Sequence, residues 1–243
     1  MRRLLLSLAS VSLVTGFFAT PSASAQQSVN FFVGGFVPTP LDARGSFTGN
    51  RSNDVLARDE DVFSFRFDSF KGVTFGGEYL VPLGNFFEAG ASIGYYQKTV
   101  PAVDKDFVDP QNRNIAANFQ LRIVPFNATF RVLPLGHGGF EPYVGGGVGV
   151  FGWRYSENGD FVLATGAISR NEVNMSTGTA VGPVVLGGFR VPIGPVVPGF
   201  EIRWQKAKGD LGVTSPPTLG RDFGGSVIDL GGMNYLFTFA IRF

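Results

Sequence analysis

The stretch "NYLFTFAIRF" (residues 234–243) decides the fold class, because large apolar residues occupy every second position in it. Polar residues, including Thr238 and Arg242, lie between them. A period of two places alternate side chains on opposite faces of a β-strand. The stretch therefore predicts a strand with one polar face and one strongly apolar face, formed by Tyr235, Phe237, Phe239, Ile241 and Phe243.

The same alternation recurs along the chain, whereas a helical period is almost absent. Eight segments show it: residues 29–37, 73–81, 87–95, 118–132, 144–150, 181–191, 200–205 and 230–243. The parity of 73–81 continues backward through Phe63, Phe65 and Phe67, which predicts that this strand begins earlier. The fold class is therefore all-β with eight strands.

A change of parity occurs at Pro125. Phe119, Leu121 and Ile123 are apolar before it, whereas Phe126 and Phe130 are apolar after it. Such a shift beside a proline is typical of a β-bulge. We therefore expect a bulge at Pro125 that keeps all five apolar side chains on one face.

An internal repeat indicates how the strands are connected. "VPLGNFFE" (81–88), "LPLGHGGFE" (133–141) and "VPIGPVVPGFE" (191–201) each place proline and glycine after a strand, as tight turns require. The remaining connections, at 38–61, 99–114, 156–175 and 206–226, are longer and polar. Alternating short and long connections are typical of an antiparallel up-and-down barrel, with all short turns at one end.

The composition indicates which face of the barrel meets which solvent. The chain has 26 phenylalanines, many of them on the oily faces, and 34 glycines, many of them on the opposite faces. A small water-soluble interior does not suit such bulky side chains, so we expect them to face lipid and the small and polar residues to line the lumen. Closing the barrel also removes strand edges that lipid cannot satisfy. The sequence thus predicts an eight-stranded antiparallel up-and-down transmembrane β-barrel.

The beginning of the sequence resembles an export signal. Arg2 and Arg3 precede an apolar run at 4–18, and Ala23-Ser24-Ala25 is a small-x-small cleavage site. We expect residues 1–25 to be a signal peptide and residues 26–243 to be the barrel domain. The sequence has no cysteine, so no disulfide is available, and its formal net charge of +1 does not favour a nucleic-acid partner.

Three features together resemble the small eight-stranded outer-membrane barrels of Gram-negative bacteria, the OmpA/OmpX/OmpW-like group. They are the signal peptide, the "EPYVGGGVGVFGW" strand (141–153) and the closing "NYLFTFAIRF". The resemblance implies a place in the cell outer membrane. It also implies that Tyr235, Phe237, Phe239, Ile241 and Phe243 form the signal read by the outer-membrane insertion machinery.

Charged residues with luminal parity lie close to the short turns. Eight strands leave an interior just wide enough for side chains to fill, so opposite charges there should pair across it. We expect a structural plug, with a gated ion path as the less favoured interpretation. The predicted luminal cluster is Glu78, Glu88, Arg131, Glu141, Arg190, Glu201, Arg203 and Arg242.

Catalytic, cofactor and metal sites are not expected, and the sequence does not predict an enzyme. The one histidine, His137, lies in a short turn and is interpreted as a solvated residue without a partner for general-base chemistry. The "GGGVG" run at 145–149 lies inside a strand, where glycines make room in the lumen. Charges in the first long loop, including Arg44, Asp54 and Asp59, are expected to be solvated.

The expected role is structural or interactive: stabilising the envelope and presenting surface loops. The alternative is a narrow channel, or a lateral-opening porin with a gap beside Pro125 or Pro183, for ions or small hydrophobic molecules. The expected partners are outer-membrane lipids and lipopolysaccharide, the insertion machinery and periplasmic chaperones. We expect a monomer. Cations proposed to contact lipopolysaccharide phosphates lie in the long connections: Arg44, Arg51, Arg58, Lys105, Arg113, Lys206, Lys208 and Arg221.

Overall fold

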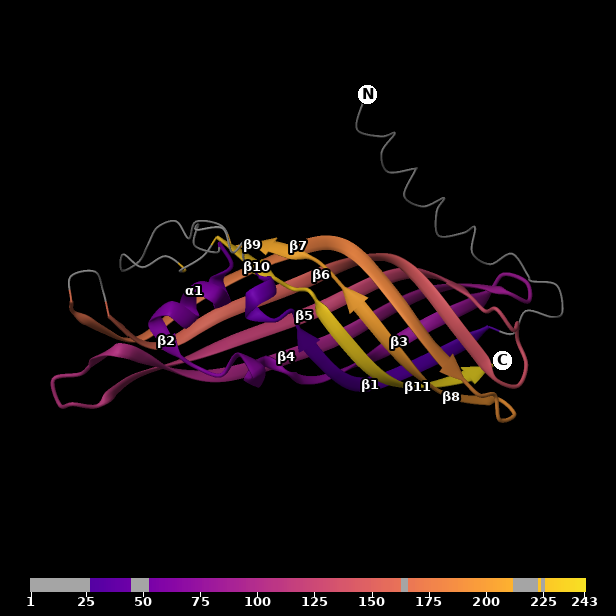
Figure 1. Ribbon diagram of the computed structural model, residues 1–243, viewed down its shortest axis with the longest axis horizontal. Coiled ribbons are helices and arrows are strands. Elements are labelled where there is room, and N and C mark those ends of the chain that lie inside the picture. The colour runs from indigo at the N-terminus through magenta and orange to yellow at the C-terminus, as the bar shows by residue number, and fades with distance from the viewer. Residues whose placement is uncertain (1–26, 45–52, 163–165, 212–222, 224–225) are drawn as a thin grey trace, which may run out of the picture.

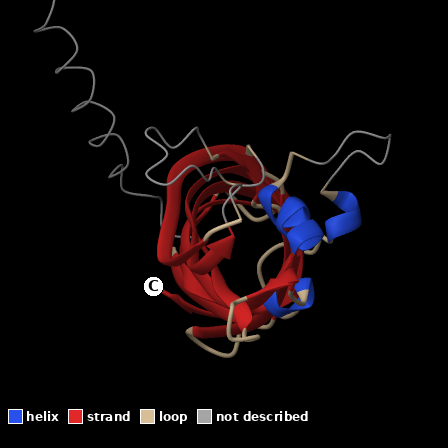
Figure 2. Ribbon diagram, turned by 90° about the vertical axis from the view of Figure 1, so that its left-hand side faces the viewer, coloured by secondary structure: helices blue, strands red, loops and turns tan. Residues whose placement is uncertain are grey.

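Eight long antiparallel strands form a closed ring in the computed structural model, which describes residues 27–44, 53–162, 166–211, 223 and 226–243 (Figures 1 and 2). The predicted signal peptide, Arg51 and Arg221 lie outside the described residues. Around the ring the order is β1, β3, β4, β5, β6, β7, β8 and β11, and β11 returns to β1. The strands are β1 (Ser28–Pro38), β3 (Gly72–Pro82), β4 (Phe87–Val108), β5 (Asn114–Val132), β6 (Glu141–Val162), β7 (Ile168–Arg190), β8 (Val196–Gln205) and β11 (Gly232–Arg242).

Closure and connectivity follow the sequence prediction. β1 and β11 pair over their full length, from Ser28↔Arg242 to Pro38↔Gly232. The three connections at 83–86, 133–140 and 191–195 are short and lie at the same end of the barrel as the C-terminus (Figure 1). Gly84 and Gly194 adopt φ of 81° and 63° in two of these turns, a conformation that glycine permits without strain. The all-β up-and-down barrel is thus confirmed.

An apolar belt surrounds the half of the barrel nearest the short turns. Phe75 on β3 is 53% exposed and Phe237 on β11 is 69% exposed, whereas the intervening Glu78 and Asn234 are buried in the lumen. All eight strands contribute outward apolar residues, and β11 contributes Tyr235, Phe237, Phe239 and Ile241. This arrangement is inside out relative to a water-soluble protein, and lipid is the solvent that suits it.

The other half of the barrel is built from four strands only. β4, β5, β6 and β7 have 22, 19, 22 and 23 residues, whereas β1, β3, β8 and β11 have 11, 11, 10 and 11. Residues 152–162 of β6 alone add about 25 Å of height at the usual rise and tilt. The segments 99–114 and 156–175 were predicted to be loops, but the structure describes most of them as strands. The four-stranded extension, as we call this region, projects beyond the belt (Figure 1).

The apolar face turns inward in the extension. Phe119 and Leu121 are fully buried and Ile123 nearly so, while Gln120 and Arg122 lie on the outer face. The register is the same on both sides of Pro125, with Tyr96↔Ile123 before it and Ile93↔Phe126 after it. The predicted bulge at Pro125 is therefore wrong. The strand runs straight, and the solvent around it changes from lipid to water.

A cap covers the apolar inner face of the extension. It contains α1 (Val55–Val62), η2 (Leu41–Ala43), β2 (Phe63–Ser64), η3 (Phe67–Phe70), β9 (Lys208–Asp210) and β10 (Val227–Asp229). The helix α1 lies against the strands at the end opposite the short turns (Figures 1 and 2). No helix in the described ranges is long and apolar enough to cross a membrane.

Several predictions for the cap region were wrong. The strand predicted through residues 63–68 is instead a two-residue strand followed by the 3-10 helix η3, and Phe63 is buried. Arg44, Asp54 and Asp59 were expected to be solvated, but all three are buried. Asp54 caps α1 by accepting hydrogen bonds from the backbone nitrogens of Leu56 (3.1 Å) and Ala57 (3.3 Å). Its carboxylate also accepts a bond from the Arg44 guanidinium at 3.3 Å, so burial is compensated.

Candidate functional site

The lumen next to the short turns holds all eight residues of the predicted charge cluster. Seven strands contribute: β3, β4, β5, β6, β7, β8 and β11. In each case the side chain points inward because it alternates with a lipid-facing residue. The eight form an array of ion pairs in two layers, with Glu78, Glu88, Glu141 and Glu201 as the acids and Arg131, Arg190, Arg203 and Arg242 as the bases.

The inner layer of this array lies deeper in the barrel. Nη2 of Arg131 is 2.7 Å from a carboxylate oxygen of Glu78 and 2.7 Å from one of Glu201. Arg203 lies 2.7 Å from Glu201 and 3.6 Å from Glu78. The Asn30 amide donates to Glu78 at 3.3 Å, which adds β1 to the layer. Arg131 on β5 thus links β3 to β8 across the lumen.

The outer layer closes the end of the barrel nearest the short turns. Arg190 donates to the carboxylates of Glu88 and Glu141, and Nε of Arg190 is 2.7 Å from Glu141. Arg242 donates to the same carboxylate of Glu141. His137 was interpreted as a solvated turn residue, but its Nε2 is 3.0 Å from Glu88 and its Nδ1 is 2.8 Å from the Asn85 carbonyl oxygen. The histidine therefore belongs to this layer.

Tyr143 lies between the two layers. The guanidinium carbons of Arg131 and Arg190 lie 4.7 and 5.7 Å from the centre of its ring, within the range of a cation–π contact. Its hydroxyl donates to Glu201 at 3.1 Å. Sequence reasoning did not select Tyr143, although its inward position two residues after Glu141 was readable from the strand parity. The phenol joins the layers into one network.

The charges of the array balance, since four glutamates and four arginines sum to zero. Buried ions are tolerated when each is paired and hydrogen-bonded, and removing one partner leaves a costly unpaired charge. All of these residues but Arg242 are less than 5% exposed. Chemically, the array is suited to holding seven strands together and to excluding free ions from the lumen.

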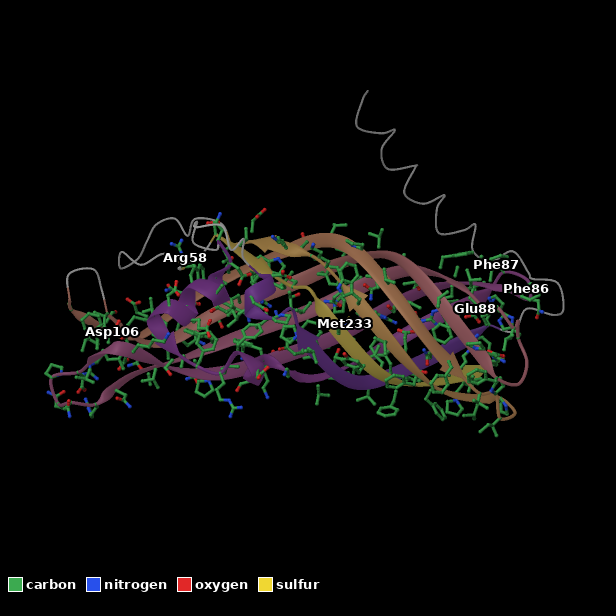
Figure 3. All side chains as sticks on the ribbon, in the orientation of Figure 1. Arg58, Phe86, Phe87, Glu88, Asp106 and Met233 are labelled. Carbon is green, nitrogen blue, oxygen red and sulfur yellow. The ribbon has the colours of Figure 1, made fainter. Side chains whose placement is uncertain are left out.

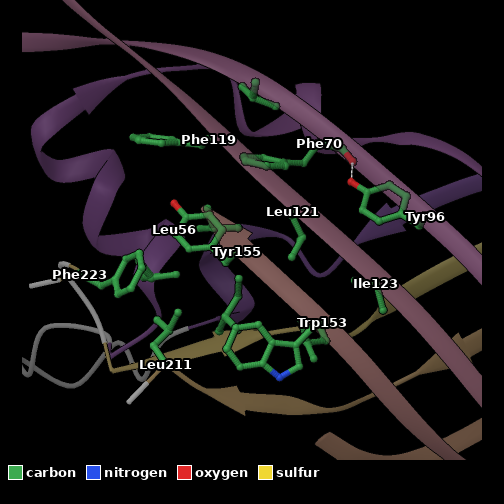
Figure 4. Close-up of a cluster of buried hydrophobic side chains, with 14 of the residues drawn as sticks. Leu56, Phe70, Tyr96, Phe119, Leu121, Ile123, Trp153, Tyr155, Leu211 and Phe223 are labelled. Carbon is green, nitrogen blue, oxygen red and sulfur yellow. Dashed lines mark hydrogen bonds between the residues drawn. The ribbon is translucent and has the colours of Figure 1, made fainter. Parts of the chain in front are cut away.

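A second barrier fills the extension. Phe119, Leu121 and Tyr155 from the strands pack against Leu56 and Phe70 from the cap (Figure 4). Tyr96 also donates a hydrogen bond to the Phe70 carbonyl oxygen, which fixes η3 to β4. Between this apolar core and the charge network lies a cavity of about 10 Å³, room for roughly one water molecule, lined by Phe36, Thr74, Tyr96, Ile123, Pro125, Gln205 and Asn234.

The contacts of His137 do not form a recognisable catalytic unit. It touches Asn85 and Glu88, and no serine or threonine hydroxyl is among its partners in the described residues. The described ranges also contain no cluster of three or more histidine, aspartate or glutamate side chains placed to hold a metal ion. Glu88, which contacts His137, lies at the end of the molecule with the short turns, and Asp106 lies at the opposite end (Figure 3).

A comparison with solved structures identifies the architecture. The outer membrane protein OprG from Pseudomonas aeruginosa superposes with a TM-score of 0.53 at 10% identity, over 90% of this chain and 96% of that chain. The fold is that of a small outer-membrane β-barrel. Neisserial surface protein A (TM-score 0.46, 12% identity, 90% of this chain and 99% of that chain) and the Escherichia coli outer membrane protease OmpT (TM-score 0.44, 12% identity, 93% and 99%) are also similar. No protein-family model and no curated protein sequence matches the chain.

Proposed function

We propose that this protein is a closed outer-membrane barrel that stabilises the envelope and holds a rigid extension outside it, without conducting solutes. The observation that carries the proposal is the contact of one guanidinium, Arg131, with carboxylates from two other strands at 2.7 Å each. The apolar core of the extension supports it as a second barrier in series. In this orientation the short turns lie in the periplasm, as in other barrels of this type.

The extension is suited to presenting a fixed surface. At the tip of the β4–β5 hairpin, Asp109 accepts hydrogen bonds from the backbone nitrogens of Gln111 (2.9 Å) and Arg113 (2.8 Å). Arg170, near the start of β7, lies 3.5 Å from Asp109 and 3.7 Å from Asp160 on β6. Ion pairs thus connect the two hairpins at their tips, and this favours a rigid projection over independent loops.

A narrow ion or proton path is the second candidate function. Several buried luminal atoms have no hydrogen-bond partner among the described residues, including Glu78 Oε1, Asn127 Oδ1 and Thr129 Oγ1. Glu78 belongs to the charge network, and Asn127 and Thr129 lie on β5 between Arg131 and Pro125. Their unpartnered oxygens favour a hydrated stretch of the lumen. A lateral opening is less favoured, because Pro125 pairs with Phe151 and Lys206 donates to the Pro183 carbonyl oxygen at 3.2 Å.

Current through single barrels in planar lipid bilayers separates the two candidates. The closed barrel should pass no resolvable current at neutral pH. An Arg131→Ser/Glu201→Ser variant, which removes an acid and a base together and keeps the lumen neutral, should produce measurable openings. Steady, cation-selective current through the unmodified protein would refute the closed-barrel proposal and support the ion path.

A further inference from the structure

Two arginines lie side by side on the outer wall of the barrel. Arg122 on β5 and Arg154 on β6 are direct antiparallel partners. Arg122 lies on the same face of β5 as the lipid-facing Phe126, and Arg154 lies on the same face of β6 as the lipid-facing Val150. Phe126 and Val150 are nearer the short turns than the two arginines. Directly opposed residues in such a pair have Cβ atoms about 5 Å apart. The two guanidinium groups therefore reach the same region of the outer surface.

The pair has no counter-charge among the residues that the structure describes. Within the described part of the chain, neither arginine takes part in a salt bridge, and Nε of Arg154 is shielded from solvent without a hydrogen-bond partner. Like charges placed directly opposite one another destabilise a sheet. The neighbouring residues with the same parity on the two strands, Gln120 and Ser156, carry no charge. An anion bound between the guanidiniums would remove the repulsion.

The row that contains the pair is built of hydrogen-bond donors. Gln97↔Arg122, Arg122↔Arg154 and Arg154↔Thr177 are successive cross-strand partners on β4, β5, β6 and β7. The Tyr95 hydroxyl donates to Oε1 of Gln97 at 2.7 Å, so that the amide nitrogen of Gln97 remains available as a donor. Such a row suits an oxyanion with several acceptor oxygens, and paired guanidiniums bind phosphate particularly well.

The height of the row identifies the source of the anion. The next outward residue toward the short turns on each strand is Tyr95, Val124, Gly152 or Thr179. Below these lies the apolar belt itself, with Ile93, Phe126, Val150 and Val181 all exposed. One outward residue on each strand thus separates the row of the arginines from the apolar belt. This position corresponds to the level of the lipid head groups. A ligand anchored in the membrane reaches this site without leaving the leaflet.

We propose that Arg122 and Arg154 bind a phosphate of an anionic glycolipid of the outer leaflet, the lipid A part of lipopolysaccharide. Gln97 and Thr177 supply further hydrogen bonds at the two sides. The proposal rests on the orientation given under the proposed function, with the extension outside the cell, but not on a closed lumen. It moves the expected lipopolysaccharide contact from cations of the long connections to the wall of the barrel.

Binding of purified lipid A to the refolded barrel in detergent micelles tests the proposal, with occupancy read by native mass spectrometry. The lipid probes are bis-phosphorylated lipid A and its fully dephosphorylated form, and inorganic phosphate is tested as a competitor. An Arg122→Gln/Arg154→Gln variant should lose affinity for lipid A by one to two orders of magnitude, because two charge-assisted contacts are removed. The matched control is Arg170→Gln, which changes a half-exposed arginine near the start of β7 and should leave affinity within about twofold.

Folding of each variant is checked separately by heat-modifiable gel mobility. If the glutamine variant does not fold, Arg122→Lys/Arg154→Lys keeps both charges and should still lose severalfold in affinity, because an ammonium group lacks the planar fork. Equal binding of phosphorylated and dephosphorylated lipid A, or unchanged binding by the variants, would overturn the proposal. Displacement of lipid A by an equal concentration of inorganic phosphate would overturn the glycolipid assignment. A conducting barrel that still binds lipid A would refute only the proposed closed lumen.

Discussion

Replacing Arg131 by methionine should destabilise the whole barrel strongly. The guanidinium is 1% exposed and makes two contacts of 2.7 Å, with Glu78 and Glu201. After the substitution, Glu201 keeps Arg203 at 2.7 Å, but Glu78 retains only Arg203 at 3.6 Å and the Asn30 amide. The variant thus buries one carboxylate without an adequate partner, which costs about 3–5 kcal/mol. Loss of the cation–π contact with Tyr143 adds about 1 kcal/mol.

Equilibrium unfolding in guanidinium chloride, with the barrel in lipid vesicles, measures this effect. The two tryptophans report on different regions: Trp204 lies in the lipid-facing belt and Trp153 in the buried core of the extension. We expect the free energy of unfolding to fall by about 4–6 kcal/mol for Arg131→Met, with both probes shifting together. Arg113→Met, at a position whose side chain is 63% exposed, should change it by less than about 1 kcal/mol.

A second substitution distinguishes a lost ion pair from a simple packing defect. Adding Glu78→Gln to Arg131→Met removes the abandoned carboxylate and should restore at least about 1–2 kcal/mol, since the cost is the uncompensated charge. If Arg131→Met unfolds within about 1 kcal/mol of the unmodified protein, or if Glu78→Gln makes it worse, the reasoning on the luminal network is refuted.

Three further predictions concern other parts of the molecule. Glu141→Gln should lower the melting temperature and raise bilayer current, because Glu141 holds both Arg190 and Arg242; no change in either would count against a plug at this end. Backbone and side-chain hydrogen bonds from Arg113 lower the pKa of Asp109 from an ordinary 3.8 to about 2, so its contribution to the hairpin is complete above about pH 4 and lost as the pH falls through 2; an NMR titration midpoint near 4 would contradict this. Phe119→Ala should cost about 3–5 kcal/mol as a buried core truncation, whereas the lipid-facing Phe126→Ala should cost clearly less, and equal losses would contradict the inward placement of Phe119.

The sequence was sufficient to predict the belt and the charge cluster, because one physical rule governs both. In segments such as 73–81 and 235–243, alternation assigns bulky apolar residues to one face and the charges to the other. Once the chain was taken as a membrane barrel, the parity of Glu78, Arg131 and Glu201 placed them in the lumen. Their pairing then followed from the small diameter of eight strands.

The extension was not predictable in the same way. Alternation shows that two faces differ, but it does not show which solvent each face meets. Phe119, Leu121 and Ile123 have the same period as Phe126 and Phe130 but the opposite phase, and the proline between them suggested a bulge. The correct explanation is that the strand leaves the membrane. Its apolar residues are then buried by cap residues far away in the sequence, such as Leu56 and Phe70, and the pattern of one strand does not reveal such contacts.

Along one uninterrupted strand, β5 is expected to face lipid and then water, and site-directed spin labelling measures this change of solvent position by position. Because the chain has no cysteine, single cysteines can be placed at successive positions from 116 to 132 without background labelling. We predict high oxygen accessibility at even positions 126–132, high accessibility to a water-soluble nickel complex at even positions 116–122, and low accessibility to both at odd positions. High oxygen accessibility at 119, 121 and 123 would contradict the account, because it would place those side chains in lipid.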